Sequence, residues 1–202
     1  MNSACPPQLR IVVLAAGLSR RLGRPKALAS VRGRTMLRRT VAVLAPFAGS
    51  SRVIVIAPPA ASRYRVECRG CAVAWVANRR RRTGLSSSVR LGIARARYSA
   101  AALLVPVDLV ELTRRDVARL IGRWHGTRRR VVGRRVSAGG GVPLILPRWL
   151  YPRCAELQGD HGMREVVGRL PAEAVCWIAL PSARSDVDTR ADLQRARRRR
   201  KP

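Results

Sequence analysis

The stretch IVVLAAGLSRRLGRPK, residues 11–26, decides the fold and the kind of site that this sequence predicts. Its first part, Ile11 to Ala16, is a short continuous apolar run, which is typical of a strand buried in a parallel sheet. The second part is polar and holds two glycines, where the backbone can approach a ligand closely. Successive backbone N–H groups can form an anion-binding concavity there, and Arg20, Arg21 and Lys26 add positive charge. We therefore expect a phosphate-binding loop directly after a buried strand.

The rest of the chain alternates short apolar runs with helical patterns. Apolar runs predict further strands over residues 53–57, 72–76, 101–107, 131–132, 142–146 and 175–180. Helical spacing predicts helices over about 35–44, 86–96, 151–157 and 163–170, one from 113, and a last one from about 190. The expected N-caps are Thr35, Thr113 and the Ser86–Ser88 run, and residues 137–141 are expected to form a flexible connection.

Strands that alternate with helices predict a three-layer α/β/α fold of the Rossmann-like kind, with a mostly parallel sheet. One domain is expected over residues 1–202, with a core over about 9–196 and a basic tail over 195–202. In such sheets ligands bind beyond the carboxyl ends of the strands. This rule brings the loop after Ala16, the loop after Val76 and Asp108 to the same edge. Asp108 either acts in that site or merely caps the helix that follows it.

The formal charge of +30 comes almost entirely from arginine, because the 41 basic residues include only two lysines, Lys26 and Lys201. The arginines are scattered through the chain with few aromatic residues among them, so a compositional preference for arginine explains them better than a nucleic-acid site does. We expect only non-specific contact with nucleic acid. A compact ammonium reaches a phosphate oxygen as a point charge, which a guanidinium does differently. Lys26 is therefore a candidate functional residue on composition alone.

Other features of the sequence exclude several classes of protein. No apolar run approaches the roughly 20 residues that span a bilayer, and the start of the chain has no signal pattern. The five cysteines are odd in number and irregularly spaced, which does not fit a disulfide framework, and Cys68-x-x-Cys71 lacks the second pair of a zinc site. We expect a reduced, cytoplasmic setting and no membrane partner.

The segment from Leu14 to Lys26 resembles the signature of the MobA-like NTP transferases, the family of the molybdenum-cofactor guanylyl- and cytidylyltransferases. The family pattern is Leu-x-Ala-Gly-x-Ser-x-Arg-Met-Gly-x-x-Lys, and this chain has Leu22 in place of the methionine. The resemblance implies that the loop holds the triphosphate of a nucleotide. The residues implied are Leu14, Ala15, Ala16, Gly17, Ser19, Arg20, Arg21, Gly23 and Lys26.

Further motifs follow in the family's order, over about residues 9–196. Asn78 with Gly84-Leu-Ser-Ser-Ser-Val-Arg-Leu-Gly92 resembles a cytidylyltransferase-type motif, which implies nucleotide binding by Asn78, Gly84, Ser86, Ser87 and Ser88 and favours CTP over GTP. Asp108 lies where the family has a metal-binding aspartate. Three later segments resemble Gly-His-Pro, Gly-Asp-x-Gly-x-Arg and Asp-Ile-Asp-Thr-Pro-Glu-Asp, and these are Gly141-Val-Pro143, Gly159 to Arg164 and Asp186 to Asp192.

The mechanism implied is attack by a terminal phosphate of an acceptor on the α-phosphorus of an NTP, with release of pyrophosphate. Mg²⁺ held by one or two carboxylates and by phosphate oxygens suits this chemistry, and Asp108 and Asp188 are the expected ligands. Asp188 could instead be the N-cap of the last helix. The resemblance implies catalytic roles for Arg21, Lys26 and Asp108, with Arg21 and Lys26 offsetting charge on the phosphates.

Two departures from the family pattern bear on the acceptor. Asp108 is followed by Leu109 and Val110 where the family has Gln-Pro or x-Pro, and Val142 replaces the histidine of Gly-His-Pro. We expect both changes to lie near the acceptor side of the site. Molybdopterin is the favoured acceptor, and a sugar phosphate or another metabolite phosphate is the alternative. A non-catalytic protein that binds nucleotide and delivers cofactor to a molybdoenzyme, or to a chaperone partner, also remains open.

Overall fold

The computed structural model describes residues 9–49, 52–127, 129–136, 139–183 and 186–198. A seven-stranded sheet lies at its centre, in the order β5-β4-β1-β6-β8-β7-β9. Within the described residues only β8 runs against its neighbours, since it pairs antiparallel with β6 and with β7. The strands are β1 (Leu9–Leu14), β4 (Val53–Ala57), β5 (Val73–Ala77), β6 (Ala101–Pro106), β7 (Val131–Val136), β8 (Gly139–Pro147) and β9 (Val175–Ile178). The expectation of a mostly parallel sheet is confirmed.

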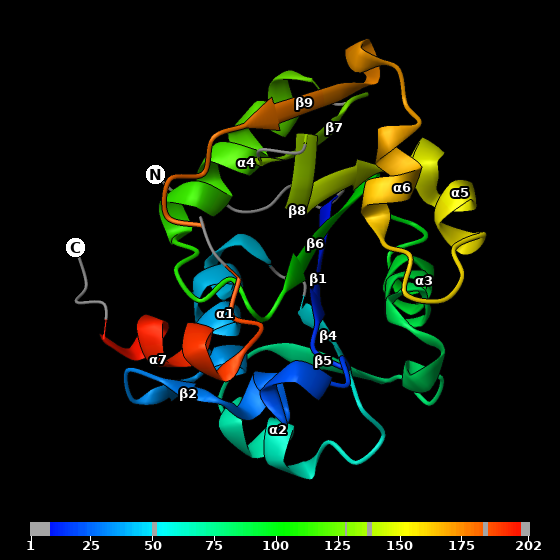
Figure 1. Ribbon diagram of the computed structural model, residues 1–202. Coiled ribbons are helices and arrows are strands. Elements are labelled where there is room, and N and C mark those ends of the chain that lie inside the picture. Colours follow the sequence, from blue (N-terminus) through cyan, green and yellow to red (C-terminus); the bar gives the residue numbers. More distant parts are fainter. Residues whose placement is uncertain (1–8, 50–51, 128, 137–138, 184–185, 199–202) are drawn as a thin grey trace.

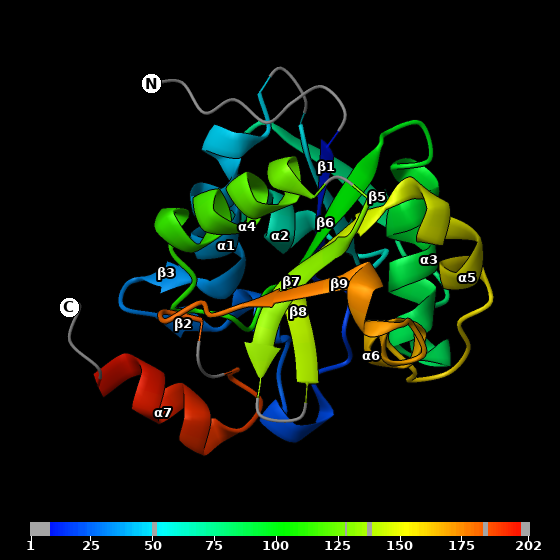
Figure 2. The same ribbon diagram turned by 90° about the horizontal axis from the view of Figure 1, so that it is seen from above.

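Helices cover both faces of this sheet, which confirms the three-layer architecture (Figures 1 and 2). One face packs against α1 (Met36–Leu44), α2 (Ser62–Glu67) and α4 (Arg114–Gly126). The other face packs against α3 (Leu85–Arg95), α5 (Tyr151–Ala155) and α6 (Met163–Gly168). The last helix, α7 (Arg190–Arg198), packs over the small hairpin of β2 (Ser30–Val31) and β3 (Arg34–Thr35). No helix among the described residues is long and apolar enough to cross a membrane.

The first strand shows why this sequence forms the middle of the sheet. Its side chains alternate between the two faces, so that Ile11 and Val13 join one core cluster and Val12 joins the other. All three are at most 2% exposed. Burial on both faces requires a continuous apolar run, and these residues supply one. Strand β1 pairs parallel with β4 and β6, which brings Leu14 level with Pro106 at the carboxyl edge.

Two local expectations were wrong. The run expected to form a flexible connection contributes Gly139 to Gly141 to β8, while Ser137 and Ala138 lie outside the described residues. The physical reason is Trp177 of β9, because a Cβ on Gly140 would stand 2.2 Å from its ring. Glycine in a strand often marks such a close approach.

The start of α3 is the second correction. The helix begins at Leu85 and Gly84 is its N-cap, so the serine run is not its cap. Ser86 to Ser88 are instead buried within the first turn, at most 5% exposed. Thr35 and Thr113 do cap their helices, each accepting a hydrogen bond from the backbone three residues on. Residues 199–202 of the basic tail lie outside the described residues.

Candidate functional site

The loop after β1 is held in shape by its own side chains. Ser19 adopts a left-handed backbone, with φ 54°, and its hydroxyl accepts a hydrogen bond of 2.9 Å from the backbone N–H of Lys26. Gly23 has φ 72°, a conformation that favours glycine. Leu22, which stands in place of the family's methionine, is 1% exposed and packs in the cluster under α7. The loop therefore closes on itself and presents Lys26 at its end.

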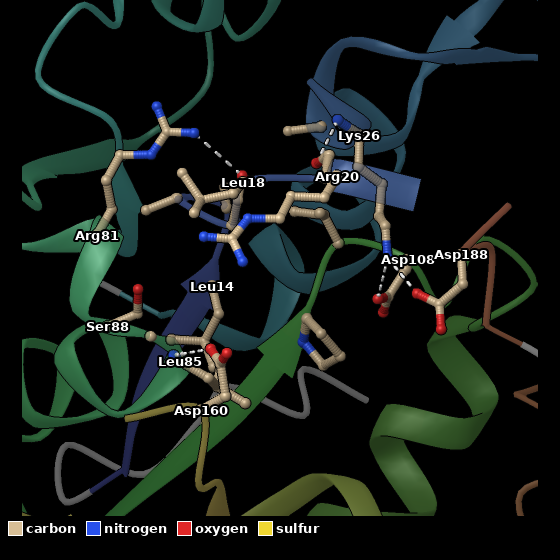
Figure 3. A pocket seen from close by; sticks show the side chains of 18 of the residues that line it. Leu14, Leu18, Arg20, Lys26, Arg81, Leu85, Ser88, Asp108, Asp160 and Asp188 are labelled. Atoms are coloured by element: carbon tan, nitrogen blue, oxygen red, sulfur yellow. Dashed lines mark hydrogen bonds and ion pairs between the residues drawn. The ribbon is translucent and has the colours of Figure 1, made fainter. Parts of the chain in front are cut away.

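A cavity of about 480 Å³ lies over this loop (Figure 3). We call it the loop cavity. Its size is typical of small-molecule sites. Most of the predicted site residues lie in its wall: Leu14, Ala15, Ala16, Gly17, Ser19, Arg20, Arg21, Lys26, Gly84, Ser88, Asp108 and Asp188. Segments that are far apart in the sequence thus meet at the carboxyl edge of the sheet.

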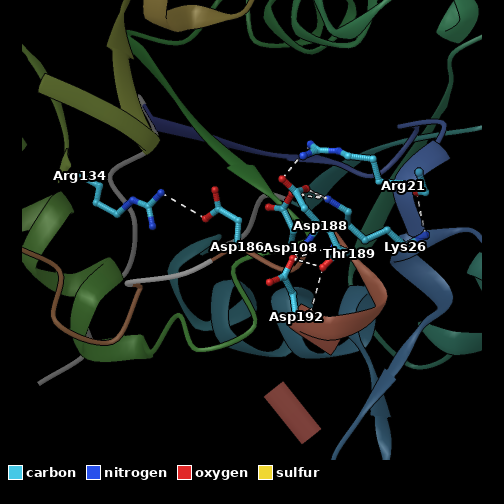
Figure 4. A network of polar contacts seen from close by, with 9 residues as sticks. Arg21, Lys26, Asp108, Arg134, Asp186, Asp188, Thr189 and Asp192 are labelled. Atoms are coloured by element: carbon cyan, nitrogen blue, oxygen red, sulfur yellow. Dashed lines mark hydrogen bonds and ion pairs between the residues drawn. The ribbon is translucent and has the colours of Figure 1, made fainter. Parts of the chain in front are cut away.

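Lys26 joins the two predicted metal ligands. Its Nζ donates to Oδ2 of Asp108 at 2.9 Å and to Oδ1 of Asp188 at 2.6 Å (Figure 4). Its side chain is only 14% exposed, and those of the two aspartates are 19% and 34% exposed. Burial lowers the pKa of Lys26, but the attraction of the two carboxylates outweighs it and the pKa is raised. Lys26 is therefore charged in this cluster.

The two carboxylates differ in their surroundings. Burial raises the pKa of Asp108, and Lys26 offsets this only in part. Burial also acts to raise the pKa of Asp188, but its bonds to Lys26 and the charge of Arg21 lower it overall. Arg21 donates from Nη2 to Asp188 at 2.9 Å, while its own side chain is 71% exposed. Asp188 is accordingly the more readily ionised of the two.

The backbone places Asp188 beside Asp108. The N–H of Val187 donates to the carbonyl oxygen of Asp108 at 3.1 Å. Thr189 and Asp192 then form the reciprocal pair of bonds that starts α7: the Thr189 hydroxyl accepts from the Asp192 N–H, and the Asp192 carboxylate accepts from the Thr189 N–H. Because Thr189 takes the capping role, the Asp188 side chain remains directed at Lys26.

The cluster fits a magnesium site of the kind that nucleotidyl transfer uses. Mg²⁺ is commonly held by one or two carboxylates together with substrate phosphates. Two carboxylates already converge here on one cation, the Lys26 ammonium. Among the described residues no group of three or more potential metal ligands occurs, so phosphate oxygens or water would complete the coordination. Asp108 and Asp188 are the residues that would hold the ion.

Four predicted nucleotide-binding residues lie outside the cavity wall. Asn78 is 2% exposed and donates from Nδ2 to the hydroxyls of Ser87 and Ser88, each at 2.9 Å. It therefore fixes the start of α3, with Ser88 as the member that reaches the cavity. Ser86 is fully buried, and Gly23 serves the shape of the loop. The direct binding role of these four stays a prediction.

Several residues of the cavity wall were not predicted to bind. Leu85, Asp160, Arg81 and Arg82 all line it. Asp160 comes from the segment that covers the start of α3, where its carboxylate accepts from the Leu85 N–H at 3.3 Å. The motif resemblance at Gly159 to Arg164 was the signal that could have found Asp160. The run of arginines before Gly84 gave no specific signal, because arginine is common throughout this chain.

The two departures from the family pattern, at Leu109 and Val110 and at Val142, lie in different surroundings. Leu109 and Val110 are 2% and 5% exposed, pack in the core and do not line the loop cavity. An apolar pair after Asp108 suits that interior position. Val142, by contrast, lines a second cavity, of about 470 Å³, next to the loop cavity.

A closed glycine-containing loop, a lysine and two convergent aspartates at the carboxyl edge of a mostly parallel sheet are the features of a nucleotidyltransferase-like domain. A family model described as the MobA-like NTP transferase domain matches residues 11–174. The chain belongs to this family. A comparison with curated protein sequences gave no match.

Solved structures with the same fold agree. Rv0371c from Mycobacterium tuberculosis H37Rv is 31% identical, with a TM-score of 0.73, over 94% of this chain and 98% of that chain. A structure of Rv0371C from the same organism in complex with manganese is 28% identical, with a TM-score of 0.69, over 94% and 97% of the two chains. Molybdopterin-guanine dinucleotide biosynthesis protein A from Archaeoglobus fulgidus shares the fold at 12% identity, with a TM-score of 0.72, over 93% and 96%.

Proposed function

We propose that this protein transfers a nucleoside monophosphate from an NTP, with CTP favoured, to a phosphate of a small acceptor, with molybdopterin favoured. The observation that carries the proposal is the convergence of Lys26, Asp108 and Asp188 at the end of the glycine loop. Nucleotidyl transfer needs little covalent help from a protein, and depends on positioning and on charge stabilisation. This cluster provides both at one point of the cavity.

In the proposed reaction an oxygen of the acceptor phosphate forms a bond to the α-phosphorus of the NTP. The bond from that phosphorus to the bridging oxygen of the β-phosphate breaks, and pyrophosphate leaves with the electron pair. Arg20, Arg21 and Lys26 lie along the loop where the triphosphate would bind, so their charges offset the charge that grows on the leaving group. A bound Mg²⁺, held by Asp108 and Asp188, supplies further charge neutralisation at the phosphates.

The preference for CTP rests on the far end of the loop cavity. Figure 3 shows Ser88, Leu85 and Asp160 at the end opposite the Lys26 cluster. A base placed there would meet a hydroxyl, a carboxylate and an apolar side chain, and the serine run resembles the cytidylyltransferase-type motif. Molybdopterin as acceptor is supported by membership of the family. The printed name of the Archaeoglobus protein with the same fold agrees with it.

Pyrophosphate release tests the proposal directly. Purified protein with Mg²⁺ is incubated with CTP, GTP, ATP or UTP, and with molybdopterin, glucose 1-phosphate or no acceptor. We expect release with CTP and molybdopterin above every other combination. Release with glucose 1-phosphate instead would identify a sugar-phosphate enzyme. CTP binding without release for any acceptor would favour a nucleotide-binding delivery protein, and RNA binding that survives high salt would point to a nucleic-acid function.

A further inference from the structure

A third cavity lies on the outer side of the loop that follows β1. We call it the proline cavity, and its volume is about 450 Å³. It lies among the end of that loop, the residues that follow β4 and β5, and the start of α2. Its wall combines apolar residues, among them Pro25, Pro58 and Pro59, with Tyr64 and four arginines. The residues predicted to bind nucleotide all lie outside this wall.

The charge of the proline cavity is entirely positive. Its four arginines are Arg63, Arg79, Arg81 and Arg82, and its wall, which is made of described residues, contains no carboxylate. Arginine is common in this chain, but the loop cavity, the cavity lined by Val142 and a smaller cavity against α7 each hold at least one carboxylate. The composition of the chain alone therefore does not account for this wall.

Three of these arginines are also free of partners within the part of the chain that the structure describes. The side chains of Arg63, Arg79 and Arg82 are exposed and form no hydrogen bond or ion pair with any described residue. Unpaired guanidiniums around one concave site produce a positive potential that attracts anions. A planar guanidinium also matches the oxygens of a phosphate group, often through two parallel hydrogen bonds.

Tyr64 adds a buried polar group to the same wall. The residue is 4% exposed, and its hydroxyl has no hydrogen-bond partner among the described residues, although the oxygen retains some accessible surface. Burial raises the pKa of Tyr64, and the charge of Arg81 offsets this only in part, so the hydroxyl is neutral and can donate. A buried hydroxyl without a partner costs free energy. An oxygen of a ligand in the cavity would supply that partner.

Two arginines connect the proline cavity to the loop cavity. Arg81 and Arg82 line both, and Nη2 of Arg81 donates to the carbonyl of Gly17 in the loop after β1 at 3.3 Å (Figure 3). An anion in the proline cavity would therefore share these charges with a triphosphate in the loop cavity. Each of the two ligands would then weaken the binding of the other, by the same factor.

We propose that the proline cavity is a second anion site, which binds a phosphate-bearing small molecule through Arg63, Arg79 and the Tyr64 hydroxyl. Its occupant weakens nucleotide binding, because both ligands draw on Arg81 and Arg82. This inhibitory effect rests on the proposed nucleotide site, whereas binding of the anion itself does not. The protein would thus respond to the concentration of a phosphorylated compound at a point outside the reacting groups.

Isothermal titration calorimetry with inorganic pyrophosphate, without Mg²⁺, tests the site. Pyrophosphate is also the proposed product at the loop cavity, so the wild type should bind two equivalents. Arg63→Met/Arg79→Met should bind one, since each lost charge-assisted hydrogen bond weakens binding about tenfold or more. Arg115→Met/Arg119→Met removes the same charge from exposed positions of α4 and is the matched control, which should bind two.

Tyr64→Phe distinguishes a binding role of the hydroxyl from a structural one. Because the hydroxyl has no partner among the described residues, its removal should not lower the free energy of unfolding. Pyrophosphate binding at the proline cavity should nevertheless weaken, by about tenfold. Unchanged pyrophosphate binding in Tyr64→Phe would overturn the role of this hydroxyl.

Ala60→Glu tests the cavity without removing any arginine. Ala60 is exposed and lines only this one of the cavities described above, so the change adds a carboxylate to the wall. It should abolish one equivalent of pyrophosphate, whereas Ala60→Gln, which is similar in size and neutral, should keep both. Two equivalents bound by Ala60→Glu and by Arg63→Met/Arg79→Met would overturn the site.

Titrations with CTP separate this inference from the proposed function. Pyrophosphate should raise the Kd for CTP in every protein, because it competes in the loop cavity, but it should raise it more in the wild type than in Arg63→Met/Arg79→Met. An equal rise in the two proteins would overturn the inhibitory role. If neither protein bound CTP, the proposed function would fail, while loss of one pyrophosphate site in Arg63→Met/Arg79→Met would still support the proline cavity.

Discussion

The loop cavity and the second cavity, which is lined by Val142 and Trp177 and is called the Trp177 cavity, meet at Leu85 but are built differently. The loop cavity uses the ends of parallel strands, and at one end of it Lys26 is bound by two carboxylates. The Trp177 cavity uses the part of the sheet where β8 reverses direction, and its buried Arg134 keeps an unpartnered Nε. The first is preorganised around one lysine and two carboxylates, which suits phosphate chemistry. The second combines apolar side chains with one buried guanidinium, which suits recognition.

The largest effect should come from Asp108→Asn. The change keeps the shape of the side chain but removes the charge that faces Lys26 and would hold Mg²⁺. We expect kcat to fall about 10³-fold, in the range found when one preorganised electrostatic contact is lost. Calorimetric CTP binding and circular dichroism should show a folded, nucleotide-binding protein. Glu156→Gln, which neutralises an exposed carboxylate, is the control. If Asp108→Asn kept turnover within a few-fold of the wild type, the role assigned to Asp108 would be contradicted.

Lys26→Met should lower kcat/KM for CTP about 10²-fold, because one fixed charge at the phosphates is lost. Lys26→Arg should restore little of this, since a planar fork does not replace a point charge between two carboxylates. Lys201→Met removes the other lysine of the chain and serves as control.

Lys26→Met also tests the metal site, by a measurement that does not depend on turnover. In Lys26→Met the Asp108 and Asp188 carboxylates lose their shared cation, so Mg²⁺ should raise the melting temperature of the variant more than that of the wild type. An equal response of the two proteins would count against a metal site at this pair.

The two cavities also differ in how far the sequence predicts them. The loop cavity comes largely from one consecutive segment, and the scarcity of lysine in the chain singles out Lys26 within that segment. The Trp177 cavity depends on contacts between distant residues, such as the packing of the Trp177 ring against Gly133 and Gly140. The glycine run from Gly139 to Gly141, taken alone, indicates flexibility, so the part of β8 that it forms could not be predicted.

The N-cap of α3 was predicted wrongly for a related reason. Serine is a favoured N-cap, and nothing local to Ser86 showed that Gly159 would lie against Gly84. A Cβ on Gly84 would stand 2.1 Å from the Gly159 carbonyl oxygen, and that oxygen accepts the Ser86 N–H at 3.2 Å. A partner more than seventy residues away therefore takes over a capping role.

Val142→His restores the family's histidine in the wall of the Trp177 cavity and should act on that side alone. The imidazole adds a polar group and bulk to an apolar wall, and changes of this size in a pocket alter discrimination by about 10-fold. We expect the KM for molybdopterin to rise by about that factor while the KM for CTP stays constant. A change in the KM for CTP would show that the two cavities do not bind separate substrates.

The smallest effect is expected next to the segment from Asp186 to Asp188, which borders both cavities, and the chain contains its own control. Thr189 with Asp192 and Thr113 with Asp116 form the same reciprocal caps, at the starts of α7 and α4. Thr189→Ala and Thr113→Ala should each lower the free energy of unfolding by about 1 kcal/mol, the usual cost of a lost N-cap. In urea unfolding the two variants should therefore be alike.

Turnover should distinguish the two caps. Loss of the Thr189 cap loosens the residue next to Asp188, so kcat should fall a few-fold, whereas α4 carries no residue of either cavity wall and Thr113→Ala should keep its kcat. Equal kcat values in the two variants would mean that the cap stabilises the fold without positioning Asp188. Unequal values, at equal stability, would show that the start of α7 holds the carboxylate against Lys26, and that the shared segment acts in catalysis through its position.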